Sequence, residues 1–258
     1  MPEPFDPLPA ASLLAETWRA GRLISELPAA IRPRTMAEGY AIQDRFLDAI
    51  AAERVGWKLA IGSHKGKRES GIGRSIAGHV LREHLFADGA RLRMPNAAPV
   101  TIEFEIAFIV GRDVPPGETV AEPLSIVSET RAAFELVLSR FVDRRAVGWP
   151  SFAADNAAFQ ALVLGDRIDP ASLPEVARTL TVSVDGVERA RAVSGDDETD
   201  PSAALGDLLA LARERGFTVP RGSIVSTGTL SAPFLQTGAA AISATYRDRR
   251  LSFSLDRE

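Results

Sequence analysis

Two glutamates separated by one residue are the first feature of this sequence that could do chemistry. Glu103 and Glu105 lie in the segment IEFEIAFIVG (102–111), where apolar and polar residues alternate as in a β-strand. Residues i and i+2 of a strand point to the same face, so the two carboxylates repel each other unless positive charge lies between them. A solvated strand face is the usual explanation, but so apolar a strand is more typical of the centre of a sheet.

A third carboxylate and a lysine interrupt other apolar runs. Glu135 lies in AFELVLSRF (133–141), where a buried acid without a partner would be costly. Three such carboxylates without equal positive partners favour a hard divalent cation, Mg²⁺ or Mn²⁺. Lys58 interrupts GWKLAIG (56–62). It is either an edge lysine that reaches water or a site lysine that balances the carboxylates or moves a proton.

Other motifs carry less information. Ser226-Thr227-Gly228-Thr229 could hydrogen-bond a ligand carboxylate or form a tight turn, which is the commoner case. GIGRSIAG (71–78) lacks the dinucleotide spacing, and neither a P-loop nor a G-x-S-x-G elbow is present. His64, His79 and His84 form no metal pair at helical spacing and are typical of solvated loops.

The elements that must position these residues predict an α+β fold. Helical spacing indicates helices over 10–22 and 36–55, the second opened by a Thr35/Glu38 capping box. Strands are predicted at 56–62 and 102–111, with a mobile loop at 62–78 between them, whereas 121–141 is either a helix or a helix leading into a strand. Asp185-Gly186 predicts a hairpin, Pro201 to Gly216 a helix, and 222–230 and 240–255 further β segments. Helices first and mostly strands afterwards favour α+β over a doubly wound sheet.

Composition excludes several classes of protein. The net charge of −4 and the lack of a basic stripe argue against a nucleic-acid partner. Without cysteines, the chain has no disulfides, thiolate catalysis or iron–sulfur clusters. Acids and prolines stand where a signal peptide needs a basic start and an apolar run, and no stretch approaches the roughly 20 apolar residues of a membrane span. We therefore expect a cytoplasmic protein with no membrane partner.

Taken in order, several segments resemble the hydratase/decarboxylase branch of the fumarylacetoacetase-like superfamily. That branch includes 2-oxopent-4-enoate (2-hydroxypentadienoate) hydratase and 4-oxalocrotonate decarboxylase. The matching segments span about 200 residues in family order, and they are GYAIQD (39–44), GWKLAIGS (56–63), IEFEIAFIVGRD (102–113), AFELVLSR (133–140), ADNAAFQALVLG (154–165) and STGTL (226–230).

The resemblance implies a mixed β-roll core with an N-terminal helical part, and usually an oligomer; we expect a homo-oligomer. We divide the chain into 1–85, with the helices, the lysine strand and the loop, and 86–258, the β-roll metal-binding catalytic domain, as one compact unit. The resemblance also implies that Glu103, Glu105 and Glu135 bind the metal and that Lys58 is catalytic. The predicted substrate contacts are Ser63, Asp155, Asn156, Thr227 and Thr229.

This sequence departs from the family pattern near the lysine. Hydratases carry Glu-Pro-Asp before an aromatic residue and a glycine, whereas the match here reads Arg74-Ser75-Ile76-Ala77-Gly78. The family's acid therefore falls on Ile76, which cannot move a proton. Leu138 and Ala158 replace an aspartate and a serine of the family, and its late Pro-Gly-Asp turn reads Thr237-Gly238-Ala239. His79 is a candidate substitute for the lost acid, or else an incidental loop histidine.

The resemblance, together with the retained metal residues, implies a metal-dependent hydratase-type lyase acting on a small 2-hydroxy-dienoate or 2-oxo-enoate in aromatic meta-cleavage-type catabolism. Chelation of a 2-oxo acid by the cation and stabilisation of an enolate would equally serve a 4-oxalocrotonate-type decarboxylase or a C–C hydrolase. The alternative from another class is a non-catalytic homologue that supports an active partner.

Overall fold

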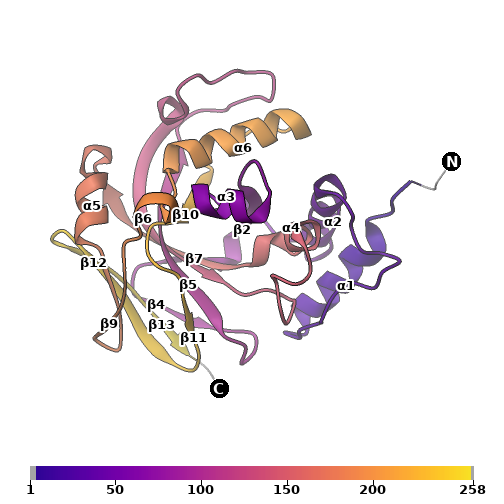
Figure 1. Cartoon of the computed structure of the whole chain (residues 1–258), viewed down its shortest axis with the longest axis horizontal. Coiled ribbons are helices and arrows are strands. Elements are labelled where there is room, and N and C mark those ends of the chain that lie inside the picture. The colour runs from indigo at the N-terminus through magenta and orange to yellow at the C-terminus, as the bar shows by residue number, and fades with distance from the viewer. Residues whose placement is uncertain (1–3, 257–258) are drawn as a thin grey trace.

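The N-terminal helices pack on one face of a large β-sheet, and a smaller sheet covers its other face (Figure 1). This computed structural model describes residues 4–256. It confirms the predicted α+β class with an N-terminal helical part. Among the described residues, no helix is both long and apolar enough to cross a membrane.

The helices are short apart from three that span at least three turns. The α-helices are α1 (Leu8–Arg19), α2 (Met36–Ala49), α3 (His64–Ser70), α4 (Trp149–Ala154), α5 (Leu173–Thr179) and α6 (Pro201–Arg215). Single turns of 3₁₀ type are η1 (Arg82–His84), η2 (Pro123–Ile126), η3 (Asn156–Ala158), η4 (Pro170–Ser172) and η5 (Gly195–Asp197).

The strands form two sheets. They are β1 (Arg54–Ala60), β2 (Ile76–Leu81), β3 (Leu85–Ala87), β4 (Ala90–Arg93), β5 (Val100–Val110), β6 (Val127–Val137), β7 (Phe159–Ile168), β8 (Thr181–Val184), β9 (Val187–Arg191), β10 (Ile224–Thr229), β11 (Phe234–Gln236), β12 (Ala240–Tyr246) and β13 (Arg249–Asp256). The eight-stranded sheet has the order β2-β1-β10-β5-β6-β7-β3, and β11 also pairs with β5. The five-stranded sheet has the order β4-β13-β12-β8-β9.

The two faces of β5 and β6 bury different kinds of side chain. Phe104 and Phe134 point toward the small sheet, where the ring of Phe104 lies 5.3 Å from that of Tyr246 and the ring of Phe134 lies 5.1 Å from that of Phe253. The glutamates point to the opposite face. There Ala107 packs in a cluster with residues of the N-terminal helices. Both faces of β5 are therefore covered.

Most predicted elements are confirmed, with their ends shifted by a few residues. Thr35 caps α2 by accepting a hydrogen bond from Glu38 N, but Glu38 in return accepts from Arg34 N, not from Thr35. Asp185 and Gly186, with φ of 51° and 81°, form the turn of the β8–β9 hairpin. The ambiguous segment 121–141 is the short turn η2 followed by β6.

The prediction of a mobile loop at 62–78 is wrong in part, because the segment contains α3 and the start of β2. Ser63 caps α3 through a hydrogen bond from Gly66 N, and Gly71 ends the helix in the left-handed conformation. The division of the chain into 1–85 and 86–258 stays a prediction. Residues 1–3 of the first unit and 257–258 of the second lie outside the described residues. The large sheet draws strands from both sides of that division.

Candidate metal centre and active site

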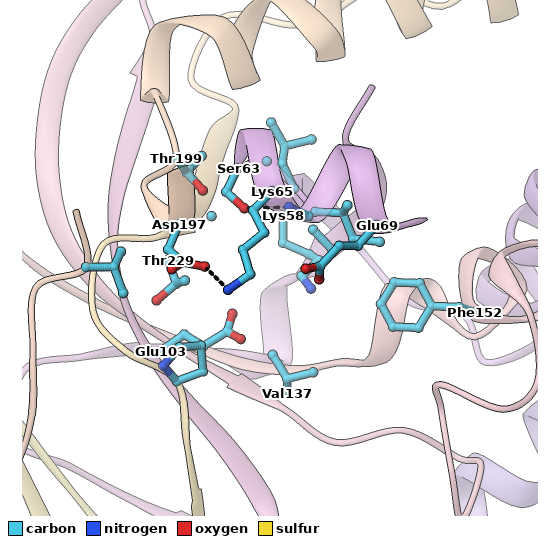
Figure 2. A pocket seen from close by; sticks show the side chains of 18 of the residues that line it. Lys58, Ser63, Lys65, Glu69, Glu103, Val137, Phe152, Asp197, Thr199 and Thr229 are labelled. Carbon is cyan, nitrogen blue, oxygen red and sulfur yellow. Dashed lines mark hydrogen bonds and ion pairs between the residues drawn. The ribbon is translucent and has the colours of Figure 1, made fainter. Parts of the chain in front are cut away.

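The three predicted glutamates meet on one face of the large sheet. Glu103 on β5 lies directly opposite Glu135 on β6, and Glu105 follows two residues along β5. One carboxylate oxygen from each lies within 4.8 Å of the others. Glu105 and Glu135 are fully buried, whereas Glu103 is partly exposed and lines the cavity shown in Figure 2. The register of the two strands thus brings Glu135 beside Glu103, which lies 32 residues earlier in the chain, and beside Glu105.

Strand β10 fixes Glu105 from the side. Ser226 Oγ donates a hydrogen bond to Glu105 Oε2 at 2.6 Å, and the backbone N–H of Gly228 donates to the same oxygen at 3.0 Å. Gly228 has φ of +99°, a conformation that glycine adopts without strain. The other oxygen, Oε1, is buried and has no hydrogen-bond partner among the described residues. Burial, followed by the charges of Glu135 and Glu103, raises the pKa of Glu105 well above its ordinary value.

Lys58 supplies one positive charge to this cluster. Its side chain is buried, and Nζ lies 2.9 Å from Glu135 Oε1 and donates a hydrogen bond to the carbonyl of Ala157 at 3.0 Å. The contact with Glu135 is an ion pair without hydrogen-bond alignment, so neither oxygen of Glu135 accepts a hydrogen bond from a described residue.

Glu105 and Glu135 have buried carboxylate oxygens that accept no hydrogen bond from a described residue, and these oxygens indicate whether a metal fits the site. Unpaired buried polar atoms are costly, and a hard divalent cation takes oxygen ligands of this kind. One lysine cannot neutralise three carboxylates. The donor set therefore fits Mg²⁺ or Mn²⁺, with Glu103, Glu105 and Glu135 as the residues that would hold it.

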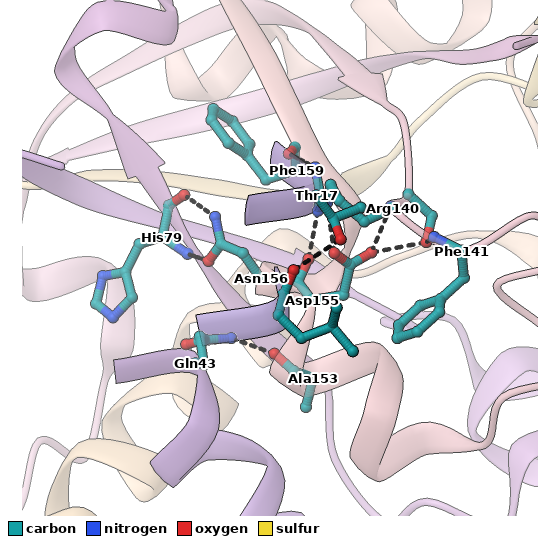
Figure 3. A network of polar contacts seen from close by, with 11 residues as sticks. Thr17, Gln43, His79, Arg140, Phe141, Ala153, Asp155, Asn156 and Phe159 are labelled. Carbon is teal, nitrogen blue, oxygen red and sulfur yellow. Dashed lines mark hydrogen bonds and ion pairs between the residues drawn. The ribbon is translucent and has the colours of Figure 1, made fainter. Parts of the chain in front are cut away.

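A strained turn places the carbonyl that Lys58 contacts. Asn156, Ala157 and Ala158 all have positive φ, between 47° and 59°, which costs non-glycine residues roughly 1–3 kcal/mol each. The Asn156 side chain holds this turn to β2 through both backbone groups of His79 (Figure 3). At Gly78 a Cβ atom would lie 2.3 Å from the Asn156 carbonyl, so only glycine allows this approach. The hydrogen bonds between Asn156 and His79 and the close approach to Gly78 hold this turn in its strained conformation.

Asp155 holds the loop that follows β6. It forms a buried ion pair with Arg140 and accepts hydrogen bonds from Ser139 Oγ at 2.6 Å and from the backbone N–H of Arg140 at 3.0 Å (Figure 3). Neither Asp155 nor Asn156 lines the cavity, and their contact with substrate stays a prediction.

A cavity of about 560 Å³ opens above the glutamates and is large enough for a small organic acid. Figure 2 shows Val137 and Phe152 on its apolar side, and Ser63, Thr199 and Thr229 on its polar side. Of the predicted hydroxyl contacts, Ser63 and Thr229 therefore reach the cavity. Thr227 does not, because it is buried and donates to the Ile106 carbonyl at 2.8 Å.

Helix α3 forms the roof of this cavity and is held by ion pairs. Lys65 Nζ lies 3.0 Å from Asp197 in η5, and Arg68 lies 2.7 Å from Asp196. Glu69, also on α3, lines the cavity with an exposed carboxylate and forms no ion pair among those of the described residues. Sequence reasoning missed Glu69 because the segment was interpreted as a loop, although Ser63 and Gly71 were the available helix signals.

The structure does not place His79 where the lost acid would act. On β1 and β2, Lys58 pairs with Gly78 and Trp57 pairs with His79, so His79 and Lys58 point to opposite faces. The His79 ring lies 5.4 Å from the Trp57 ring and lines a separate cavity of about 650 Å³ that none of the glutamates reaches. Burial lowers the pKa of His79 to about 3, so the ring is neutral. Ile76 is fully buried in the apolar core.

Comparison with known proteins agrees with this geometry. Residues 74–246, about two thirds of the chain, match the family model described as fumarylacetoacetate (FAA) hydrolase C-terminal. A 2-keto-4-pentenoate hydratase from Burkholderia vietnamiensis is 27% identical over 245 residues, which cover 92% of each chain. A 4-oxalocrotonate decarboxylase from a Pseudomonas species is 25% identical over 182 residues, 70% of each chain.

A solved structure shares the whole fold. The 4-oxalocrotonate decarboxylase from Pseudomonas putida G7, complexed with magnesium and adipate, superposes with a TM-score of 0.81 at 20% identity and covers 97% of this chain and 98% of its own. The family match, over more than half of the sequence, includes β5, β6 and β10 that build the glutamate cluster. This chain belongs to the fumarylacetoacetate hydrolase family.

Proposed function

We propose that this chain is a divalent-metal-dependent lyase of the 2-keto-4-pentenoate hydratase type. Its substrate would be a small 2-hydroxy-dienoate or 2-oxo-enoate acid from the breakdown of ring-cleaved aromatic compounds. The observation that carries the proposal is the cluster of Glu103, Glu105 and Glu135 beside the buried Lys58, which opens to a cavity through Glu103 and Lys58. The names of the relatives support the choice of substrate class.

In this proposal each residue has a defined task. The three glutamates hold the cation, and Ser226 and Gly228 keep Glu105 in place. When bound, Mg²⁺ or Mn²⁺ polarises the keto oxygen of a 2-oxo acid and stabilises negative charge that develops there. Lys58 is held by Glu135 and the Ala157 carbonyl, and it lines the cavity. From there it would move a proton to or from substrate carbon.

Glu69 is our candidate for the second proton carrier in place of the acid lost at Ile76. It is a cavity carboxylate outside the metal cluster, and unlike Asp197 it has no cation paired with it among the described residues. We expect Glu69→Gln to lower turnover and to leave Mn²⁺ affinity unchanged. Asp196→Asn is the control, since Asp196 pairs with Arg68 on α3 but does not line the cavity.

Three further functions are alternatives to hydration. Decarboxylation of a 2-oxo acid, or C–C hydrolysis, would use the same chelation, and one sequence relative is a decarboxylase. A non-catalytic subunit that supports an active partner is favoured by Ile76, which stands in an apolar environment where the family has an acid. A homo-oligomer of this chain stays part of the proposal.

The test is turnover of 2-hydroxypenta-2,4-dienoate, followed by its ultraviolet absorbance, with Mn²⁺, with EDTA and with the Glu103→Gln variant. Loss of absorbance that needs both Mn²⁺ and Glu103 supports the hydratase. Metal-dependent release of carbon dioxide from a 2-oxo-enedioate supports the decarboxylase instead. If the protein binds Mn²⁺ tightly but turns over neither acid, whether it is a monomer or an oligomer, the non-catalytic role is favoured and the lyase is contradicted.

A further inference from the structure

Two adjacent arginines stand at the junction of two cavities. Arg144 and Arg145 belong to the loop between β6 and α4, and both line the cavity above the glutamates and a neighbouring cavity of about 400 Å³. Glu103, Val137 and Pro233 also line both cavities. The arginines therefore lie where the two cavities meet, together with Glu103.

These arginines have no anion of their own. Among residues 4–256, no ion pair or side-chain hydrogen bond involves either guanidinium. The neighbouring acid, Asp143, uses Oδ1 to accept hydrogen bonds from the backbone N–H groups of Arg145, at 2.9 Å, and Ala146, at 3.3 Å. Burial lowers the pKa of Arg144; the charge of Glu103 opposes this shift and that of Arg145 adds to it. Glu135 and Asp155 also oppose the shift, so the carboxylates that act on Arg144 belong to the metal cluster or to the Arg140 pair, and none of them pairs with Arg144 directly.

A count of charges gives the same result for the loaded site. A divalent cation and Lys58 carry three positive charges, which balance the three glutamates. Lys65 is balanced by Asp197. Once a cation occupies the glutamates, Glu103 no longer compensates Arg144, and the two arginines face the cavity with two positive charges. Glu69, on the roof helix, offers one exposed carboxylate against them.

We propose that Arg144 and Arg145 bind a second, distal carboxylate of the substrate, so that the preferred ligand is a dicarboxylic 2-oxo acid. The 2-oxo acid end would lie at the glutamates, the carbon chain along Val137, and the distal carboxylate at the arginines. Guanidinium groups suit this role because they bind a carboxylate through two parallel hydrogen bonds. This inference rests on the proposed function, since it presupposes that a 2-oxo acid binds at the metal.

The loop is built to hold these side chains in place. Its first part is fixed by the buried pair of Arg140 with Asp155, and its turn by the Asp143 side chain. The ordering cost of binding is therefore lower than for arginines on a free loop, because less backbone freedom is lost.

The experiment compares two ligands of equal chain length. Calorimetry in Mn²⁺ measures the affinity of 2-oxohexanedioate and of 2-oxohexanoate, which differs by lacking the distal carboxylate. Wild-type protein is expected to prefer the diacid by roughly tenfold or more, as for one charge-assisted pair. Arg144→Gln and Arg145→Gln should each reduce the preference, and the double variant should abolish it. Arg144→Lys should recover part of it, because lysine keeps the charge but not the paired geometry.

Arg250→Gln is the matched control, since it removes the same charge from β13, outside both cavities. Equal affinity of the two ligands for wild-type protein would overturn the inference while leaving the metal site intact. An unchanged preference for the diacid in the double variant would also overturn it. If neither acid binds in Mn²⁺, and Glu103→Gln binds Mn²⁺ as wild type does, the proposed function itself fails. Circular dichroism checks that each variant is folded.

Discussion

Replacing Glu105 with glutamine separates the roles of its charge and its shape. In the metal-free protein, burial, followed by the charges of Glu135 and Glu103, raises the pKa of Glu105 and so favours its protonated form, which a neutral amide resembles. The glutamine carbonyl can accept the hydrogen bonds from Ser226 Oγ and Gly228 N, and its NH₂ group then points toward the other carboxylates. We therefore expect Glu105→Gln to fold normally and to bind metal poorly.

The distances give the size of both effects. Two ionised carboxylates within 4.8 Å of each other repel by about 3 kcal/mol or more at an effective dielectric constant of about 20. A full negative charge on Glu105 would thus destabilise the metal-free protein, and a neutral side chain avoids this. The free energy of unfolding without metal should change by less than about 1 kcal/mol, since the hydrogen bonds are kept.

Thermal unfolding with Mn²⁺ and with EDTA measures the metal effect. At a Mn²⁺ concentration of about 100 times its dissociation constant, binding stabilises the wild type by about 2.7 kcal/mol. This corresponds to a rise of roughly 5–10 °C in Tm for a chain of this size. A variant that binds about 100-fold more weakly gains only about 0.4 kcal/mol, or roughly 1 °C.

Glu16→Gln, a change on the exposed surface of α1, serves as control and should keep the full rise. A rise of wild-type size in Glu105→Gln would remove Glu105 from the metal site. A loss of several kcal/mol in the metal-free variant would show that the carboxylate is ionised there, against the argument from repulsion.

Three other changes test neighbouring groups. Lys58→Ala should abolish turnover, and it should lower the metal-free Tm because the buried Glu135 loses its partner. Calorimetry should show that this variant binds Mn²⁺ at least as tightly as wild type. Retained turnover would contradict the catalytic role of Lys58. Asp155→Asn should lower the free energy of unfolding, measured in urea, by about 3–5 kcal/mol, because it leaves Arg140 buried and unpaired. Unchanged stability with lost ligand binding would instead support contact between Asp155 and the substrate. His79 is neutral when folded and takes up a proton when unfolded below pH 6.5, so its contribution is complete above pH 6.5 and declines by up to about 5 kcal/mol toward pH 3. His79→Gln should flatten this decline in urea unfolding between pH 6.5 and 3, and an identical slope would contradict the assignment.

The sequence predicts the glutamate pair well because the rule behind it is local. Alternation along a strand puts Glu103 and Glu105 on one face whatever the rest of the fold does. The direct opposition of Glu103 and Glu135 depends on the register between β5 and β6, which a single sequence does not specify. The three acids in apolar segments predict a shared cation, but not how the strands bring the acids together.

The place of His79 in the fold escaped prediction for a related reason. A segment rich in glycine and charge is typical of a loop, so the sequence around Gly78 predicts no strand and no facing for His79. In β2, however, Gly78 is the residue opposite Lys58, which puts His79 on the other face. Gly78 is glycine because the strained turn at Asn156 approaches it, a constraint between segments 78 residues apart. Contacts of this range leave no local pattern in the sequence.

The arrangement also explains which parts of the site can vary. The glutamates and Lys58 lie on central strands covered on both faces, and a change of register there would move every side chain to the wrong face. Glu69 on α3 and Arg144 in its loop reach the same cavity from segments that only cover the sheet. A substitution in the strands should therefore weaken the binding of every ligand that needs the cation. A substitution in the covering segments should change the choice among ligands, because those residues meet the part of the ligand that the cation does not hold.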